Sequence, residues 1–274
     1  MNLVNNITFL SKLTYNNVIE YFKDRLDTCT DTLTTNSIYW YGHATTLINI
    51  NNTVIITDPV LSNSLGYFKR IVKKPLDISS QKIDYILLSH GHMDHLHFPS
   101  LRKLKKLNPN ITVIVPKGYK KLMKLLGFKN IVLIRQGQTY KDNTITVKAI
   151  KANHDGRRFY VGIDNESNSY LINISDKTIF YAGDTAYTED FNGIKCDAAI
   201  MPVGCYMPER FSYMHCTPKE SYNMFQKMNC DVMIPVHYKT FKISLEDFDE
   251  TERTLKSFKD SKIKILNIGN SYKL

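Results

Sequence analysis

Four of the eight histidines in this chain of 274 residues lie close together, between positions 90 and 97. They follow the largely apolar run IDYILL at 83–88, which predicts a buried strand. The motif at 90–95 is His-x-His-x-Asp-His, and imidazole and carboxylate groups are good ligands for zinc and similar divalent ions. His90 and His92 can chelate one ion, whereas Asp94 and His95 can turn toward a second. The sequence therefore predicts a metal centre at the end of a strand.

Strand-like and helix-like stretches alternate along the rest of the chain. Runs with strand patterning lie at 37–42, 45–50, 53–59, 111–116, 131–137, 144–152, 169–175, 177–184, 198–204, 231–238 and 262–268. Helix-like spacing of apolar residues predicts helices at 15–31, 99–108, 117–127, 217–228 and 244–258. This alternation is typical of an α/β architecture in which helices cover the sheets.

The N-terminal part of the chain predicts one helix ahead of the main domain. The helix expected at 15–31 rests on the helical spacing of its apolar residues Val18, Tyr21, Phe22 and Leu26. We therefore expect residues 1–35 to form a helical extension and residues 36–274 to form a single domain.

The chain is basic. Lysine and arginine together number 36, aspartate and glutamate number 26, and the formal net charge is +10. This charge favours anionic partners such as a phosphorylated small molecule, nucleic acid or an anionic membrane surface, although a lysine-rich solvated surface gives the same count. The basic residues are scattered, and the sequence has no arginine-rich tail or basic and aromatic run, which argues against nucleic acid.

Other sequence features bear on the cell compartment. No apolar run approaches the ~18 residues that indicate a membrane-spanning helix. The N-terminus lacks the basic start and apolar centre of a signal peptide, so we expect a cytoplasmic protein. The five cysteines are odd in number and none has CxxC spacing, so we expect free thiols rather than a disulfide framework or a zinc finger. The oligomeric state stays open, and a homo-oligomer is one alternative.

The His-x-His-x-Asp-His motif after a buried strand resembles that of the metallo-β-lactamase superfamily of hydrolases. The resemblance implies a four-layer αβ/βα sandwich over residues 36–274, with metal ions at the edge between two sheets. It also implies three ligands farther along the chain. The sequence has a suitable residue after a predicted strand in each case, namely His154, Asp184 and His237.

The metal centre that this resemblance implies is dinuclear. The ligands of the first ion are His90, His92 and His154. The ligands of the second ion are Asp94, His95 and His237. Asp184 bridges the two ions. The remaining histidine of the cluster, His97, has no role that the resemblance assigns, and we expect it at the surface.

A closer resemblance is to one branch of the superfamily, the N-acyl-phosphatidylethanolamine-hydrolysing phospholipase D-like proteins and the related sugar-phosphate lactonases. The segments that carry it are 40–45, 57–59, 202–206 and 237–241. Segment 214–220 matches the place where the phospholipases carry an additional active-site histidine, which is His215 here. Segment 155–158 is similar to the loop that follows their downstream histidine ligand.

Several further residues are candidates for binding substrate or for orienting a ligand. His43 either orients a ligand or is a buried histidine hydrogen-bonded at a strand end. Asp58 either supports the ligand loop or caps a turn. Arg157 and Arg158 could clamp a phosphate or carboxylate, although both could equally be ordinary surface arginines. Tyr206 belongs to one of the matching segments.

The resemblance implies a hydrolase in which two divalent ions share a bridging water and lower its pKa, so that hydroxide attacks a phosphodiester, an ester or a lactone. Asp94 and Asp184 would orient the hydroxide. His215 would orient the substrate or protonate the leaving group. Zinc is the expected metal, with manganese, iron and nickel as alternatives for these ligands. The expected substrate is a small anionic or lipid-like molecule.

Two other functions stay open. A nuclease of the same superfamily is compatible with the net charge of +10. However, the segment between Asp184 and His237 is too short for a large inserted RNA-binding domain. A non-catalytic metal-binding module fits poorly, because the sequence has the whole set of ligands.

Overall fold

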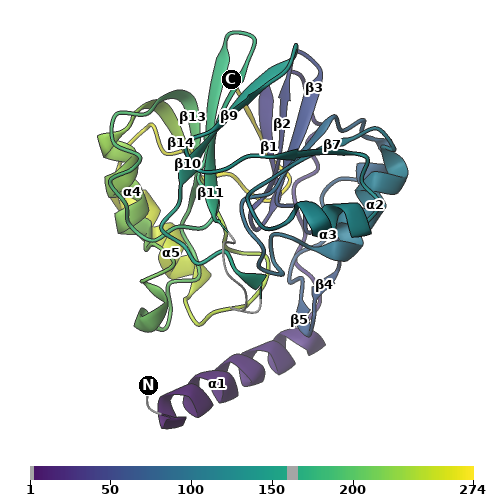
Figure 1. The fold of residues 1–274 in the computed structure, drawn as a ribbon. Coiled ribbons are helices and arrows are strands. Elements are labelled where there is room, and N and C mark those ends of the chain that lie inside the picture. The colour runs from purple at the N-terminus through teal and green to yellow at the C-terminus, as the bar shows by residue number, and fades with distance from the viewer. Residues whose placement is uncertain (1–2, 159–165) are drawn as a thin grey trace.

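The computed structural model describes residues 3–158 and 166–274 of the chain. Two sheets face each other, and helices cover the outer face of each one (Figure 1). This arrangement is the four-layer αβ/βα sandwich, and it confirms the predicted fold class. None of the helices in the described part of the chain combines the length and hydrophobicity that a membrane crossing requires.

The first sheet comes from the N-terminal half and the C-terminal end of the chain. Its strands are β1 (Ser37–Gly42), β2 (Thr45–Ile50), β3 (Thr53–Thr57), β6 (Tyr85–Leu87), β7 (Thr112–Val115), β8 (Asn130–Leu133) and β15 (Ser271–Lys273). Their order among the described residues is β15-β1-β2-β3-β6-β7-β8, and β3, β6, β7 and β8 are parallel. The outer face is covered by α2 (Phe98–Leu107) and α3 (Lys120–Leu125).

The second sheet comes from the C-terminal half. Its strands are β9 (Thr139–Lys141), β10 (Ile145–Lys151), β11 (Asn168–Ile174), β12 (Lys177–Tyr181), β13 (Lys195–Pro202) and β14 (Asn229–Val236). Their order among the described residues is β14-β13-β12-β11-β10-β9, and β12, β13 and β14 are parallel. The outer face is covered by α4 (Pro218–Lys227) and α5 (Phe248–Ser257).

One large apolar cluster joins the two sheets. It includes Trp40 from the first sheet and Tyr170 and Phe180 from the second, all fully buried. Trp40 stacks on Tyr238, with ring centroids 5.2 Å apart, and its indole N–H donates a hydrogen bond to the carbonyl of His43 at 2.9 Å. Burial of apolar surface is the main favourable term in folding, and here it also fixes the turn between β1 and β2.

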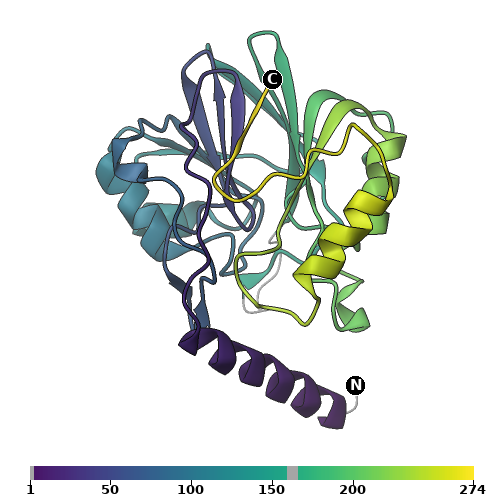
Figure 2. The same cartoon turned by 180° about the vertical axis from the view of Figure 1, so that it is seen from behind.

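A short hairpin and a long helix lie at the lower edge of the sandwich. The hairpin of β4 (Ser64–Leu65) and β5 (Phe68–Lys69) projects from this edge. Helix α1 (Leu3–Phe22) lies below it and crosses beneath both halves of the sandwich (Figure 2). These elements therefore lie on the side where the parallel strands of both sheets end.

The helix predicted at 15–31 has different bounds, because α1 begins at Leu3 and ends at Phe22. Leu26 has left the helix and pairs with an extended segment. Its N–H donates to the carbonyl of Ile71, and its own carbonyl accepts from the N–H of Lys73, both at 2.9 Å. These tertiary hydrogen bonds end the helix early. The division of the chain at residue 35 stays a prediction.

Two other predictions from the sequence were wrong. Segment 262–268 is not a strand, since its only pairing is a single bridge between Ile263 and Met233 among the described residues. Cys196 and Cys230 form a disulfide between neighbouring positions of β13 and β14, whereas we expected free thiols. The register of the two strands, which the sequence spacing does not reveal, brings these cysteines together.

Candidate metal centre

The predicted ligands lie in loops that follow the ends of strands at the lower edge. The motif at 90–95 follows β6, His154 follows β10, Asp184 follows β12, and His237 follows β14. Because parallel strands of a sheet end at the same edge, these loops meet although they are far apart in the sequence. The structure brings all seven predicted ligands together.

The first group of side chains consists of His90, His92, His154 and Asp184. One donor atom of each lies within 4.8 Å of the others. Nε2 of His154 is 3.1 Å from Nδ1 of His92, and Nε2 of His90 is 3.8 Å from a carboxylate oxygen of Asp184. This grouping contains the three histidines that the resemblance assigns to the first ion.

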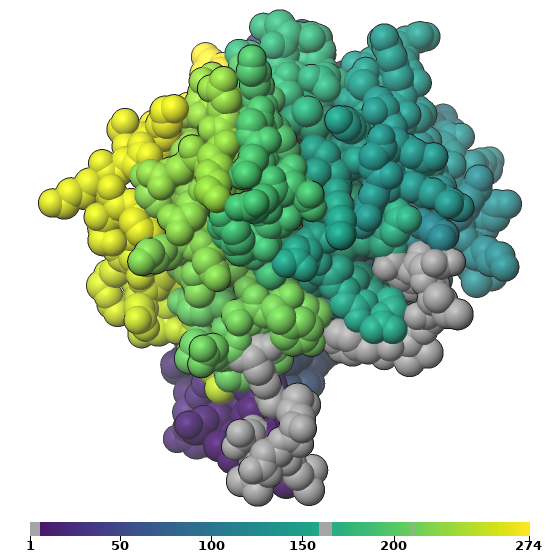
Figure 3. Space-filling view, turned by 60° about the vertical axis from the view of Figure 1, so that its left-hand side comes forward, coloured from purple at the N-terminus to yellow at the C-terminus, as the bar shows by residue number. Residues whose placement is uncertain are grey.

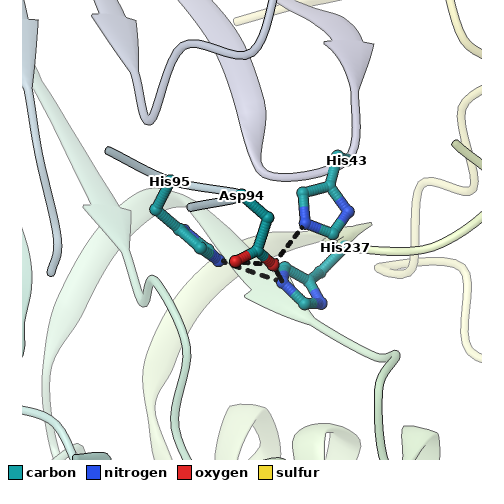
Figure 4. A group of neighbouring side chains, drawn as sticks. All are labelled: His43, Asp94, His95 and His237. Atoms are coloured by element: carbon teal, nitrogen blue, oxygen red, sulfur yellow. Dashed lines mark hydrogen bonds and ion pairs between the residues drawn. The ribbon is translucent and has the colours of Figure 1, made fainter. Parts of the chain in front are cut away.

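The second group consists of His43, Asp94, His95 and His237 (Figure 4). Nε2 of His95 and Nε2 of His237 are 3.1 Å apart. The carboxylate of Asp94 is 2.9 Å from Nε2 of His43 and 3.6 Å from Nε2 of His237. His43 therefore lies in direct contact with the candidate ligands, which favours the orienting role over that of a histidine bonded only to a strand end.

Asp184 lies between the two groups. Its Oδ2 is 3.0 Å from Nε2 of His95, its Oδ1 is 3.0 Å from Nε2 of His237, and the carboxylate also belongs to the first group. This is the position that a bridging ligand requires. Its role as a bridge between two ions stays a prediction.

The donor atoms fit a cation site. Among the described residues, Nε2 of His90 is buried and makes no hydrogen bond. A buried polar atom without a partner is unfavourable unless another species, such as a metal ion, satisfies it. All donors are imidazole nitrogens or carboxylate oxygens, which suit zinc and related divalent metals.

The electrostatics of the site also favour added positive charge. Burial would raise the pKa of Asp184, but the charges of His237 and His95 outweigh it and hold this pKa well below its usual range. Burial would lower the pKa of His95, but Asp184 and Asp94 outweigh it and raise this pKa well above its usual value. Burial lowers the pKa of His154 to about 3. The carboxylates are thus held ionised, and His154 is neutral and able to bind a cation.

Asp58 supports the ligand loop from the interior of the sandwich. It is fully buried at the end of β3, and its carboxylate accepts hydrogen bonds from the backbone N–H of Ser89 at 2.7 Å and from Nδ1 of His95 at 2.6 Å. The hydroxyl of Tyr181 donates to the same carboxylate from the second sheet. These bonds fix the ring of His95 with Nε2 facing the site, so the structure favours support of the loop over a turn cap.

Several residues at the site have left-handed backbone conformations. The φ angles of His43, Asp58, Cys205 and His237 are 53°, 33°, 64° and 71°. Residues other than glycine rarely adopt this region, because Cβ approaches the backbone too closely. The close packing around the site therefore holds these backbone segments in place.

A cavity of about 280 Å³ opens beside the candidate ligands. His92, Asp94, Asp184 and His215 form its polar part, and Arg158 lies in its wall. Nδ1 of His215 is 3.7 Å from a carboxylate oxygen of Asp184. The apolar part of the wall consists of Leu65, Phe68, Met93, Phe211, Met214 and Ile243. A molecule in this cavity would contact the histidine and aspartate cluster and an apolar surface at once.

Other candidate residues lie outside this cavity. The guanidinium of Arg157 donates to the carboxylate of Asp155, with Nε at 2.8 Å from Oδ1. The hydroxyl of Tyr206 forms a hydrogen bond with Thr251 at 3.1 Å. His97 is buried, so the expectation that it lies at the surface was wrong. Its ring is hydrogen-bonded to the hydroxyl of Ser100 at 2.8 Å.

The sequence did not reveal some residues that shape the site. Ser89 and Tyr181 hold Asp58, and Cys205 and the β4–β5 hairpin line the cavity. Tyr181 shortly precedes Asp184 in the chain, which was a weak signal. The sequence of the hairpin contains no such signal, because its place in the cavity wall depends on tertiary packing.

We expect Asp58→Ala to lower the affinity for divalent metal by about 10-fold to 100-fold, because His95 would lose the partner that orients its ring. Titration of the metal-free protein with zinc in a calorimeter measures this change. Asp84→Ala is the matched control, because Asp84 accepts from the N–H of Val54 at the start of β3, away from the site. An unchanged affinity in Asp58→Ala would contradict the supporting role.

The metal-free chain should lose stability as the pH falls from about 7 to about 5. Burial lowers the folded-state pKa values of His43, His154 and His215 to about 4, 3 and 4. Below pH 6.5, which is about the pKa of histidine in the unfolded chain, these residues bind protons in the unfolded state but not in the folded state. His95 and His237, whose pKa values are raised, act in the opposite direction, because the folded chain already holds these two protons before the unfolded chain takes them up. The histidines with lowered pKa values, which also include His90, outnumber them, so the net effect is a loss of stability. Urea midpoints measured with a chelator test this, and a constant or rising midpoint would contradict it.

Comparison with known proteins agrees with this fold. The sequence profile of the beta-lactamase superfamily domain matches residues 53–238. An N-acyl-phosphatidylethanolamine-hydrolyzing phospholipase D, mitochondrial, of Saccharomyces cerevisiae is 31% identical over 79% of this chain and 50% of its own length. The chain thus spans half the length of that relative. A UPF0173 metal-dependent hydrolase of Bacillus cereus is 28% identical over 77% of this chain and 88% of its own length.

Solved structures share the fold. The metallo hydrolase Igni18 of Ignicoccus hospitalis superimposes with a TM-score of 0.68 at 18% identity, over 86% of this chain and 97% of that protein. The profile match covers more than half of the chain and includes the histidine motif, Asp184 and His237. The chain therefore belongs to the beta-lactamase superfamily, and it is a metal-dependent hydrolase of the metallo-β-lactamase fold.

Proposed function

We propose that this protein hydrolyses the phosphodiester bond of a lipid-like substrate, in the manner of a phospholipase D. One observation carries this proposal. The same cavity contains the histidine and aspartate cluster, the cationic side chain of Arg158 and six apolar side chains. A phosphodiester with an apolar chain has a matching group for each of these parts. The similarity to a phospholipase D of yeast supports the same class of substrate.

The polar side of the cavity favours a phosphodiester over a lactone. Nη1 of Arg158 donates to the carbonyls of Gly91 and Leu96 at 3.0 and 2.8 Å, which holds the guanidinium against the metal-binding loop. A phosphodiester keeps a negative charge near this cation, whereas a lactone is neutral. Arginine is well suited to bind phosphate, because its donors are planar and permanently charged.

The residues of the two groups would bind two divalent ions, and zinc suits their nitrogen and oxygen donors best. When bound, such ions lower the pKa of water and polarise a phosphoryl oxygen. Asp94 and Asp184, both held ionised, would accept hydrogen bonds from the attacking water and so orient it. Manganese, iron and nickel are the alternatives.

His215 would orient the substrate. Its side chain lines the cavity, and burial lowers its pKa to about 4, so the imidazole is neutral near pH 7. A neutral imidazole with this pKa is a weak proton donor, but its N–H can donate a hydrogen bond to a phosphoryl or leaving-group oxygen. Of the two roles expected from the sequence, orientation is therefore the one we propose.

A nuclease activity has less support. Proteins that bind single strands use a long positively charged groove with stacking aromatic side chains. Among the described residues that line this cavity, Arg158 is the one lysine or arginine. Its volume of about 280 Å³ suits a compact group better than a strand of nucleic acid.

We expect His92→Ala and Asp184→Ala to lower the rate of hydrolysis of bis(p-nitrophenyl) phosphate by more than about 100-fold, because each change removes a metal ligand. Loss of a ligand should lower the rate more than loss of a residue that only orients a ligand. Metal content, measured by elemental analysis, should fall in parallel. The control is Asp142→Ala, whose carboxylate accepts from Tyr85 and Tyr140 at the other edge of the sandwich. Full activity in a metal-depleted variant would contradict the proposal. If the protein hydrolyses single-stranded RNA but not bis(p-nitrophenyl) phosphate, it is a nuclease and the proposal is wrong.

His215→Ala should lower the rate on the same phosphodiester by about 100-fold, because the reacting phosphoryl group would lose a hydrogen-bond donor, and should leave the metal content unchanged. The matched control is His97→Ala. His97 is also buried, and burial also lowers its pKa to about 4, but its ring bonds to Ser100. Loss of metal from His215→Ala would show that His215 is a ligand, since it lies within reach of Asp184 and His237.

A further inference from the structure

Helix α1 turns an apolar face toward solvent. It carries seven of the fourteen large apolar side chains that are exposed in the described part of the chain, from Ile7 to Phe22. Phe22 is 84% exposed. Figure 3 shows the helix as a projection at the lower edge of the molecule. A contiguous apolar surface of this kind indicates a binding partner.

The inward face of α1 is partly polar. Leu13, Asn17 and Glu20 lie along one stripe of the helix and are buried. The side-chain amide of Asn17 donates to the carbonyl of Lys242 at 2.8 Å, and the carboxylate of Glu20 is 3.0 Å from Nζ of Lys242. An amphipathic helix usually buries its apolar stripe, whereas here polar contacts fix the helix with that stripe outward.

Both halves of α1 contact elements that line the cavity beside the candidate ligands. The ring of Phe9 packs edge-on against Phe211, with centroids 5.3 Å apart, and Phe211 lines the cavity. Near the other end, Nζ of Lys69 donates to the carbonyl of Tyr21 at 3.1 Å, and the neighbouring Phe68 also lines the cavity. A surface that binds the outer face of α1 would therefore lie beside the mouth of the cavity.

Basic side chains border this apolar face, among them Lys23, Arg25 and Lys69, although the acidic Asp24 and Asp27 also follow the helix. Glu20 is the one acidic residue in the sequence of α1, and it is paired with Lys23 at 2.9 Å and with Lys242 at 3.0 Å. Arg25 and Lys69 line a separate cavity of about 710 Å³ between α1 and the β4–β5 hairpin. The hairpin also exposes Tyr67. Apolar and cationic side chains thus border one another along the helix.

We propose that α1 and the β4–β5 hairpin dock the protein onto an anionic phospholipid bilayer. The apolar side chains of α1 would enter the interface, and Lys23 and Arg25 would lie near the lipid phosphates. The docked surface would hold the cavity mouth next to the bilayer. This surface lies outside the reacting groups, so the proposal is tested separately from the proposed function.

Charge favours a bilayer over a second copy of the chain as the partner. Two copies that met through α1 would each carry a formal net charge of +10 and bring their basic borders together. Like charges repel across such an interface, whereas anionic headgroups attract the same residues. The charge of the chain therefore complements an anionic lipid surface.

Co-sedimentation with vesicles tests the proposal. We expect the full chain to bind vesicles of phosphatidylcholine mixed with phosphatidylglycerol, to bind pure phosphatidylcholine less, and to dissociate as salt is added. Phe22→Ser should lower the partition coefficient by about tenfold, because it removes a large apolar side chain from the interface. The matched control is Leu125→Ser on α3, because Leu125 is also 84% exposed but lies away from α1.

Further measurements separate the outcomes. Phe22→Ser should keep the native circular dichroism spectrum and the wild-type rate on the soluble phosphodiester, and Val18→Ser takes its place if it does not fold. The proposal is wrong if the chain binds neither kind of vesicle, if it binds both kinds equally, or if Phe22→Ser (or Val18→Ser in its place) binds as tightly as the wild type. An oligomer that Phe22→Ser dissociates, without vesicle binding, would identify a second copy as the partner.

Discussion

The buried carboxylate of Asp58 is the interaction on which the site depends. It lies at the end of β3 and accepts hydrogen bonds from Ser89 and His95 of the first sheet and from Tyr181 of the second. A buried carboxylate needs such partners, because an unpaired one is strongly unfavourable. The same bonds that satisfy its oxygens orient His95 and tie the two sheets together next to the cavity. Stability of the sandwich and geometry of the site are thus coupled through one side chain.

Each group of candidate ligands draws on both sheets. His90 and His92 from the first sheet meet His154 and Asp184 from the second, and Asp94 and His95 meet His237 in the same way. Neither half of the chain holds a complete group, so the centre forms only when the sheets pack against each other. The apolar cluster around Trp40 is therefore a condition for metal binding as well as for folding.

The sequence predicted the parts of this protein that are local. The motif at 90–95 is contiguous, so its chemistry could be inferred directly, and the alternation of strands and helices predicted an α/β architecture, whereas the four-layer sandwich followed from the family resemblance. His154, Asp184 and His237 stand alone in sequence, and only the resemblance to a family connected them. The pairing of Cys196 with Cys230 depends on strand register, and the end of α1 depends on the bonds of Leu26 to a distant segment. Helical spacing likewise identified Val18 and Phe22 as one apolar face, but it could not show that this face points outward.

The left-handed backbone at His43, Asp58, Cys205 and His237 links folding to the binding of a metal ion. Each such residue carries a conformational penalty of about 1–3 kcal/mol, and four of them cluster at one edge. Without an ion, the burial of apolar side chains must offset this penalty alone. With an ion bound, the free energy of metal binding would offset part of it. A bound ion should therefore raise the free energy of unfolding of the whole sandwich.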